Sequence, residues 1–303
     1  MASERFSQQA FLGVSALLFV GSAALAIVWC GSMAAMDGMA MPGGWTMSMA
    51  WMRMPGQTWP GAAASFLAMW LVMMTAMMLP SLVPALWRYR RELRGIATGK
   101  IAVGQTAIGK PAIDSPANGK SEEAGGKPLG AKRDLLTLLV GAGYFLIWTA
   151  FGLLIFPLGA ALAKVEMQHA SLARLAPSIV CIVFLLAGAL QFTGWKAHHL
   201  ARCREVHSEE VHSDESHSDD CALLVDTRSS AWRYGMRLGL HCSYSSAGLT
   251  AILLVCGVMD LRAMALVTAA ITVERLAPNS ERIAQIIGAI AIAIGLLLMA
   301  RQI

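Results

Sequence analysis

Apolar residues in this chain are gathered into long runs separated by polar breaks. A helix that crosses a membrane needs about 20 mainly apolar residues, and several of the runs reach that length. The pattern therefore predicts an all-α fold, a polytopic transmembrane helix bundle that forms one membrane domain over residues 1–303. The last two runs are short enough to form one re-entrant hairpin, so six or seven spans are expected. The runs cover residues 11–30, 61–87, 134–163, 172–195, 234–258, 262–273 and 284–300.

The first run has two interpretations, a retained helix or a cleaved secretory signal. It is longer than the 7–15 apolar residues typical of a signal core. One Arg and one Glu precede it, and Trp29 is too large for a cleavage site. These features favour a retained helix.

Two polar segments interrupt the runs. Residues 88–133 carry ten Lys and Arg without a helical or strand period, which predicts a flexible, disordered basic loop. Residues 198–231 form a second disordered loop, rich in His and acidic residues. Pro80 and Pro84 are expected to kink or end the second helix. The positive-inside rule places the basic loop in the cytoplasm. It places the segment Met33–Gly56 outside, because Arg53 is the one basic residue there.

Composition supports a membrane protein and argues against other classes. Hydrophobic residues make up 56% of the chain and charged residues 14%, against about 25% charged in soluble domains. The net charge of +5 is better explained by loop orientation than by nucleic-acid binding. The expected surroundings are a lipid bilayer, with no nucleic-acid partner. No dinucleotide fingerprint, P-loop, zinc-protease motif or nucleophile elbow is present, so the chain is not expected to be an enzyme.

The segment Met33–Gly56, called the Met-rich segment below, holds eight methionines in 24 residues. Thioethers are soft, neutral ligands that select Cu(I). A Gly-rich chain with methionines two or three residues apart can wrap one ion. The alternative is an apolar loop lying on the bilayer or contacting a partner protein. The candidate ligands are Met36, Met39, Met41, Met47 and Met49.

A second group of methionines lies in the predicted helix that follows. Met69, Met73 and Met77 are spaced four residues apart, as are Met74 and Met78, so they form neighbouring stripes on one helix. A thioether ladder there would pass a soft ion from the Met-rich segment into the membrane. The alternative is that these side chains are simply apolar packing. Met73, Met74, Met77 and Met78 are the candidate ligands.

A degenerate five-residue repeat in the second polar segment places His207, His212 and His217 among acidic residues. Such tracts bind Zn, Ni or Cu(II) weakly, so zinc or nickel is a secondary expectation there. The alternative is a solvated acidic linker.

Further candidates lie in or near predicted helices. His241 and Cys242 are adjacent in the fifth run, and polar groups within membrane helices are often functional, although backbone groups could equally satisfy them. His199 and Cys203 are four residues apart, a spacing that suits a metal or a basic helix at the headgroups. Glu274 is expected either to pair locally with Arg275 or to lie as an intramembrane carboxylate beside the site. The other cysteines are interpreted as packing.

Several pieces of sequence together resemble a bacterial family of predicted metal-binding integral membrane proteins of unknown function, whose members are often labelled copper chaperones. The resemblance implies metal handling. The family pattern has a Cys-Cys pair shortly after the position of Cys242, where this chain has Ser245 and Ser246. If that cluster is the family's metal site, this member keeps one thiolate. The matching pieces are residues 69–81, 143–148, 191–204, 235–242 and 257–278.

The resulting hypothesis is a multi-pass protein of the bacterial inner membrane that binds copper as Cu(I). It would collect the ion at the Met-rich segment, relay it through the second and fifth helices and deliver it to a copper-accepting protein. One alternative is a transporter of copper or another metal. Another is a membrane scaffold or accessory subunit for a copper enzyme, without metal of its own.

Overall fold

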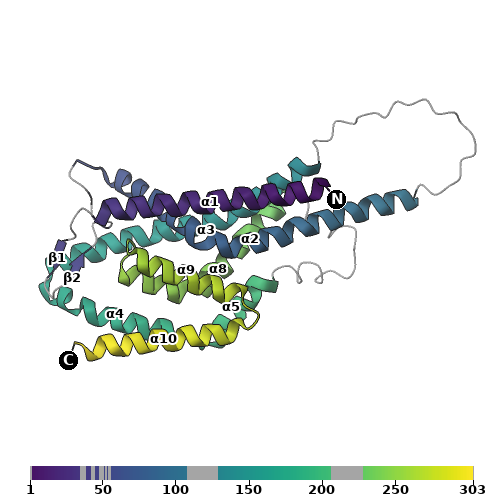
Figure 1. Cartoon of the computed structure of the whole chain (residues 1–303). Coiled ribbons are helices and arrows are strands. Elements are labelled where there is room, and N and C mark those ends of the chain that lie inside the picture. Colours follow the sequence, from purple (N-terminus) through teal and green to yellow (C-terminus); the bar gives the residue numbers. More distant parts are fainter. Residues whose placement is uncertain are drawn as a thin grey trace, which may run out of the picture.

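The computed structural model describes residues 2–34, 39–41, 45–47, 51, 53, 56–107, 129–205 and 228–302. Within those ranges the chain forms eight helices and one two-stranded hairpin, which confirms the predicted all-α class (Figure 1). The helices are α1 (Ala2–Ala34), α2 (Trp59–Ala107), α3 (Leu129–Gln168), α4 (Ala170–Leu190), α5 (Gly194–Glu205), α8 (Arg228–Cys256), α9 (Leu261–Leu276) and α10 (Ser280–Ala300). The strands are β1 (Met39–Met41) and β2 (Trp45–Met47).

Six of the described helices, α1, α2, α3, α4, α8 and α10, are long and apolar enough to cross a membrane. Large apolar side chains such as Leu17 and Leu154 point outward and are exposed, as lipid-facing positions would be. Helix α9 has 16 residues, fewer than the about 20 of a full span. It runs beside α8 as a helix of its own (Figure 1). Six long spans plus one short helix agree with the predicted six or seven.

The ends of both predicted polar loops need correction. Helix α2 continues to Ala107 and α3 begins at Leu129, so both ends of the expected 88–133 loop are helical. Strong helix formers at positions 90–94 and the burial of Tyr89 and Leu93 explain why the helix continues past position 88. Helices α5 and α8 likewise shorten the expected 198–231 loop. The middle parts, 108–128 and 206–227, lie outside the described residues.

The prolines of the second span do not end it. Pro80 and Pro84 both lie inside α2, which continues well beyond them. Proline is tolerated in buried membrane helices because neighbouring groups can satisfy the carbonyls it leaves unpaired. Of the two expected outcomes, a kink or an end, the end is therefore wrong, and a kink at these residues stays a prediction.

Helix α8 is central and contacts α3, α4, α5 and α9. Its close approach to α3 depends on two glycines. A Cβ on Gly143 would lie 2.7 Å from the carbonyl oxygen of Trp232, and one on Gly235 would overlap the backbone of Val140. Small residues at such crossings let two membrane helices touch along their backbones. This contact sets α3 and α8 close enough to share the site described below.

The two ends of the bundle differ in what they carry. The N-terminus, the end of α2 and helix α5 lie at one end, whereas the β1–β2 hairpin, the α8–α9 turn and the C-terminus lie at the other (Figure 1). At the first end, Arg90 on α2 forms an ion pair with Asp134 on α3, with 2.6 Å between Nη2 and Oδ1. The hairpin end contains strands from the Met-rich segment.

Candidate metal centre

The methionines of α2 are all inside the bundle. None is more than 6% exposed, and all belong to one contiguous apolar core. We call this set, Met69, Met73, Met74, Met77 and Met78, the Met stripe. The spacing of four residues along the helix produces this shared burial, as the sequence predicts. The stripe places its five thioether sulfurs in the protein interior rather than toward lipid.

One end of the Met stripe meets Cys242 on α8. The sulfur of Cys242 lies 3.9 Å from the sulfur of Met78, and the side chain of Cys242 is fully buried. The hydroxyl of Tyr144 on α3 is 2.7 Å from the same sulfur. A thiol and a thioether are both soft ligands. The fold thus brings two candidate ligands together from helices far apart in the chain.

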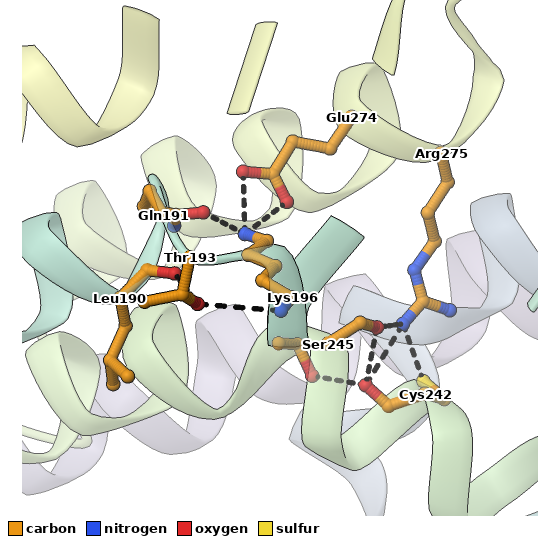
Figure 2. A network of polar contacts seen from close by, with 9 residues as sticks. Leu190, Gln191, Thr193, Lys196, Cys242, Ser245, Glu274 and Arg275 are labelled. Atoms are coloured by element: carbon orange, nitrogen blue, oxygen red, sulfur yellow. Dashed lines mark hydrogen bonds and ion pairs between the residues drawn. The ribbon is translucent and has the colours of Figure 1, made fainter. Parts of the chain in front are cut away.

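Arg275 on α9 also contacts the sulfur of Cys242. Its Nη2 atom donates to Sγ at 2.9 Å and to the Cys242 carbonyl oxygen at 3.1 Å (Figure 2). The same nitrogen donates to the Ser245 hydroxyl at 3.1 Å, and Nη1 donates to Ser81 at 3.4 Å. The thiolate is the form of cysteine that binds metals. A guanidinium fixed beside the sulfur provides the positive charge that balances a thiolate in a nonpolar interior.

Ser245 and Ser246 lie one helical turn beyond Cys242 and are both buried. Their hydroxyls donate to the Cys242 carbonyl oxygen at 2.9 Å and 2.8 Å. Residues three and four positions apart share one face of a helix. The two serines therefore occupy the face where further thiolates would reach the site. In this chain their hydroxyls bond to the backbone instead.

A buried ion pair lies beside this cluster. Lys196 on α5 donates to both carboxylate oxygens of Glu274 on α9, at 2.9 Å and 2.8 Å, and also to the side-chain oxygen of Gln191 (Figure 2). Burial lowers the pKa of the Lys196 ammonium, and the Glu274 carboxylate acts in the opposite direction. Glu274 thus pairs with Lys196, whereas Arg275 contacts Cys242 and Ser245. The expected local ion pair between Glu274 and Arg275 is therefore wrong. Sequence reasoning missed Lys196, because a lysine after a predicted span is ordinarily a surface residue.

His241 lies beside His199, which α5 brings against α8. Their Nδ1 atoms are 3.2 Å apart, and both rings are half-buried. Two nitrogens at about 2.0–2.1 Å from one tetrahedral ion would lie about 3.3 Å apart. The pair therefore has the spacing of two ligands on one ion as well as that of a hydrogen bond. In the described part of the chain, no three His, Cys, Asp or Glu side chains gather as a metal site.

The remaining candidates lie in the β1–β2 hairpin or outside the described residues. The β1–β2 register pairs Met39 with Met47 and Met41 with Trp45. Opposite positions on antiparallel strands are near neighbours, so the hairpin brings these methionine positions together. Met36, Met49, His207, His212 and His217 lie outside the described residues, so their proposed ligand roles stay predictions.

A cavity of about 30 Å³ adjoins the Cys242 cluster. Ser81, Tyr144 and Arg275 line it on the side of the cluster, and the exposed Arg88 lies at its rim. This volume is enough for about two water molecules. It links the surroundings of Cys242 to the part of α2 that follows the Met stripe.

Comparison with known proteins assigns the family. The family model PpoB2, described as a copper chaperone, matches residues 67–109 and 117–298. Because the match covers most of the chain, including the Met stripe, Cys242 and Glu274, this protein belongs to that family. A search of curated proteins and a search of solved structures each gave no match.

Proposed function

We propose that this protein is a multi-pass membrane copper chaperone that binds Cu(I) between Cys242 and Met78 and delivers it to an acceptor protein. The observation that carries the proposal is the 3.9 Å contact between the two sulfurs in a fully buried setting. Two sulfur ligands at about 2.3 Å from one ion lie about 3.8 Å apart in tetrahedral geometry and about 4.0 Å apart in trigonal geometry. The pair therefore has the spacing of two ligands on one ion as well as that of a thiol–thioether hydrogen bond.

The other parts of the fold have roles in this proposal. The Met-rich segment captures Cu(I) outside a bacterial inner membrane, and the Met stripe conducts it inward. Arg275 donates to the Cys242 sulfur and places a positive charge beside the ligand atom. The His199–His241 pair offers imidazole ligands on the α5 side. The cavity beside Tyr144 and Arg275 provides room for the ion on its way to an acceptor at that end.

The capture role is tested with a variant in which Met36, Met39, Met41, Met47 and Met49 are all replaced by leucine. Leucine keeps the apolar volume and removes the ligand atom. Cu(I) is titrated into the detergent-purified protein against a chromogenic chelator. Weaker binding or slower uptake supports capture by the segment, whereas unchanged binding and uptake contradict it. Met264→Leu, at a buried methionine on α9, is the matched control.

A transporter is the second candidate, favoured by the depth of the Met stripe. From Met69 to Met78 the helix rises about 13 Å, close to half of the about 30 Å hydrocarbon thickness. A transporter moves copper across sealed vesicles without an acceptor, whereas a chaperone releases copper only when an acceptor is added. Flux into proteoliposomes therefore separates the two functions.

A further inference from the structure

A second contact between a thiol and a thioether lies at the hairpin end of the bundle. The sulfur of Cys30, near the end of α1, is 3.8 Å from the sulfur of Met259. Met259 lies in the turn between α8 and α9, 229 positions further along the chain. Cys30 is 5% exposed and Met259 is half-buried. The pair is thus inside the protein but close to its surface.

This contact repeats the geometry of the Cys242–Met78 pair. The two sulfur–sulfur distances are 3.8 Å and 3.9 Å. Both agree with the separation of about 3.8–4.0 Å expected for two sulfur ligands that share one ion. Each pair joins elements that are distant in sequence, so neither arises from local helical spacing. Cys181, which is also buried, contacts the Gln302 amide instead, so burial alone does not bring a cysteine beside a methionine.

The position of the Cys30–Met259 pair suits the path of an ion from the Met-rich segment to the Met stripe. Cys30 is followed three residues later by Met33, where the Met-rich segment begins. The C-terminal end of α1 and the α8–α9 turn lie at the same end of the bundle as β1 and β2 (Figure 1). Cys30 also belongs to the same apolar core as Met69, the first residue of the Met stripe. The pair therefore lies at the hairpin end of the bundle, in an apolar core that also contains the Met stripe.

We propose that Cys30 and Met259 form a second, outer site for Cu(I). It receives the ion from the Met-rich segment and passes it to the Met stripe. The copper keeps its oxidation state, and the Cys30 thiol releases its proton to the aqueous side as the Cu–S bond forms. This inference rests on the proposed function, because both sites hold the same cargo.

The test counts Cu(I) ions bound per full-length chain, by chelator competition in detergent under anaerobic conditions. Cys30→Ala, Met259→Leu and Cys242→Ala are compared with the control Cys181→Ala. The proposal expects Cys30→Ala and Met259→Leu each to bind one ion fewer than wild type, with the inner ion retained. Met259→Leu is a near-isosteric change that preserves the fold, so its loss cannot be attributed to unfolding.

The outcomes separate the two proposals. If Cys242→Ala loses an ion while Cys30→Ala and Met259→Leu keep all of theirs, the outer site is overturned and the proposed function stands. If Cys30→Ala and Met259→Leu lose one and Cys242→Ala loses none, the outer site stands and the inner site fails. If no variant differs from wild type, both proposals are overturned.

Discussion

The sulfurs of Cys242 and Met78 lie 3.9 Å apart although the two residues are 164 positions apart in the chain. Helices α8 and α2 bring them together, and Tyr144 and Arg275 contact the cysteine sulfur from α3 and α9. Four helices thus converge on one sulfur in the interior. Buried polar groups in membrane helices are costly and mark functional sites. This convergence is the physical basis for proposing the inner copper site here.

Introducing thiols at Ser245 and Ser246 is expected to tighten Cu(I) binding. The two positions share the helix face of Cys242, three and four residues further along α8. The Ser245→Cys, Ser246→Cys double variant should therefore raise Cu(I) affinity about tenfold or more, equivalent to at least about 1.4 kcal/mol. Chelator competition measures the change. A double variant with wild-type affinity would show that this helix face does not reach the ion.

The Lys196–Glu274 pair is expected to stabilise the fold only as a pair. Removing one partner of a buried ion pair leaves an uncompensated charge and costs about 3–5 kcal/mol, whereas replacing both by apolar residues is often neutral. Lys196→Met should therefore lower the thermal unfolding midpoint in detergent, and Lys196→Met with Glu274→Met should recover most of it.

Lys164→Met is the matched control for this comparison, because Lys164 is exposed on α3. It should leave the unfolding midpoint close to that of wild type. A double variant as unstable as Lys196→Met alone would contradict this prediction, because removal of the unpaired Glu274 charge would then bring no recovery.

The α3–α8 contact is expected to reject any side chain at Gly235. A Cβ there would overlap the backbone of Val140, so Gly235→Ala must push the two helices apart. Overpacking of this kind costs about 1–3 kcal/mol. The shift would also move Tyr144 away from Cys242, so Cu(I) affinity should change together with stability.

Gly141→Ala, on α3, is the control variant, and it is not expected to lower stability. No atom lies within 4 Å of a Cβ at Gly141, and alanine is a better helix former than glycine. Thermal unfolding should therefore show an unchanged or slightly raised midpoint for Gly141→Ala and a lowered one for Gly235→Ala. Equal midpoints for the two variants would contradict the close helix crossing.

The helix bundle could be predicted from the sequence because hydrophobic run length is set by bilayer thickness. The Met stripe could be predicted because a spacing of four residues fixes one helix face. The extent of α2 could not, since residues 88–107 lack the apolar signal but still form a helix. There, intrinsic helix propensity and the burial of Tyr89 and Leu93 decide the structure.

The partners of the site residues required the fold. Cys242 was recognisable as a polar group in a membrane helix, but nothing in its local sequence indicates Met78 or Arg275 as its neighbours. Lys196 follows a predicted span, where a lysine is ordinarily on the surface, and only the packing of α5 against α8 and its contact with Glu274 on α9 bury it. The Cys30–Met259 contact was also hidden, because a lone cysteine at a helix end is ordinarily packing.

The most direct test of the inner site is a Cu(I) titration of wild type, Cys242→Ala and Met78→Leu against a chromogenic chelator, with Cys181→Ala and Met264→Leu as buried controls. The account predicts that Cys242→Ala and Met78→Leu each lose tight binding of one ion, and that the controls bind as wild type does. Wild-type binding by both Cys242→Ala and Met78→Leu would contradict it.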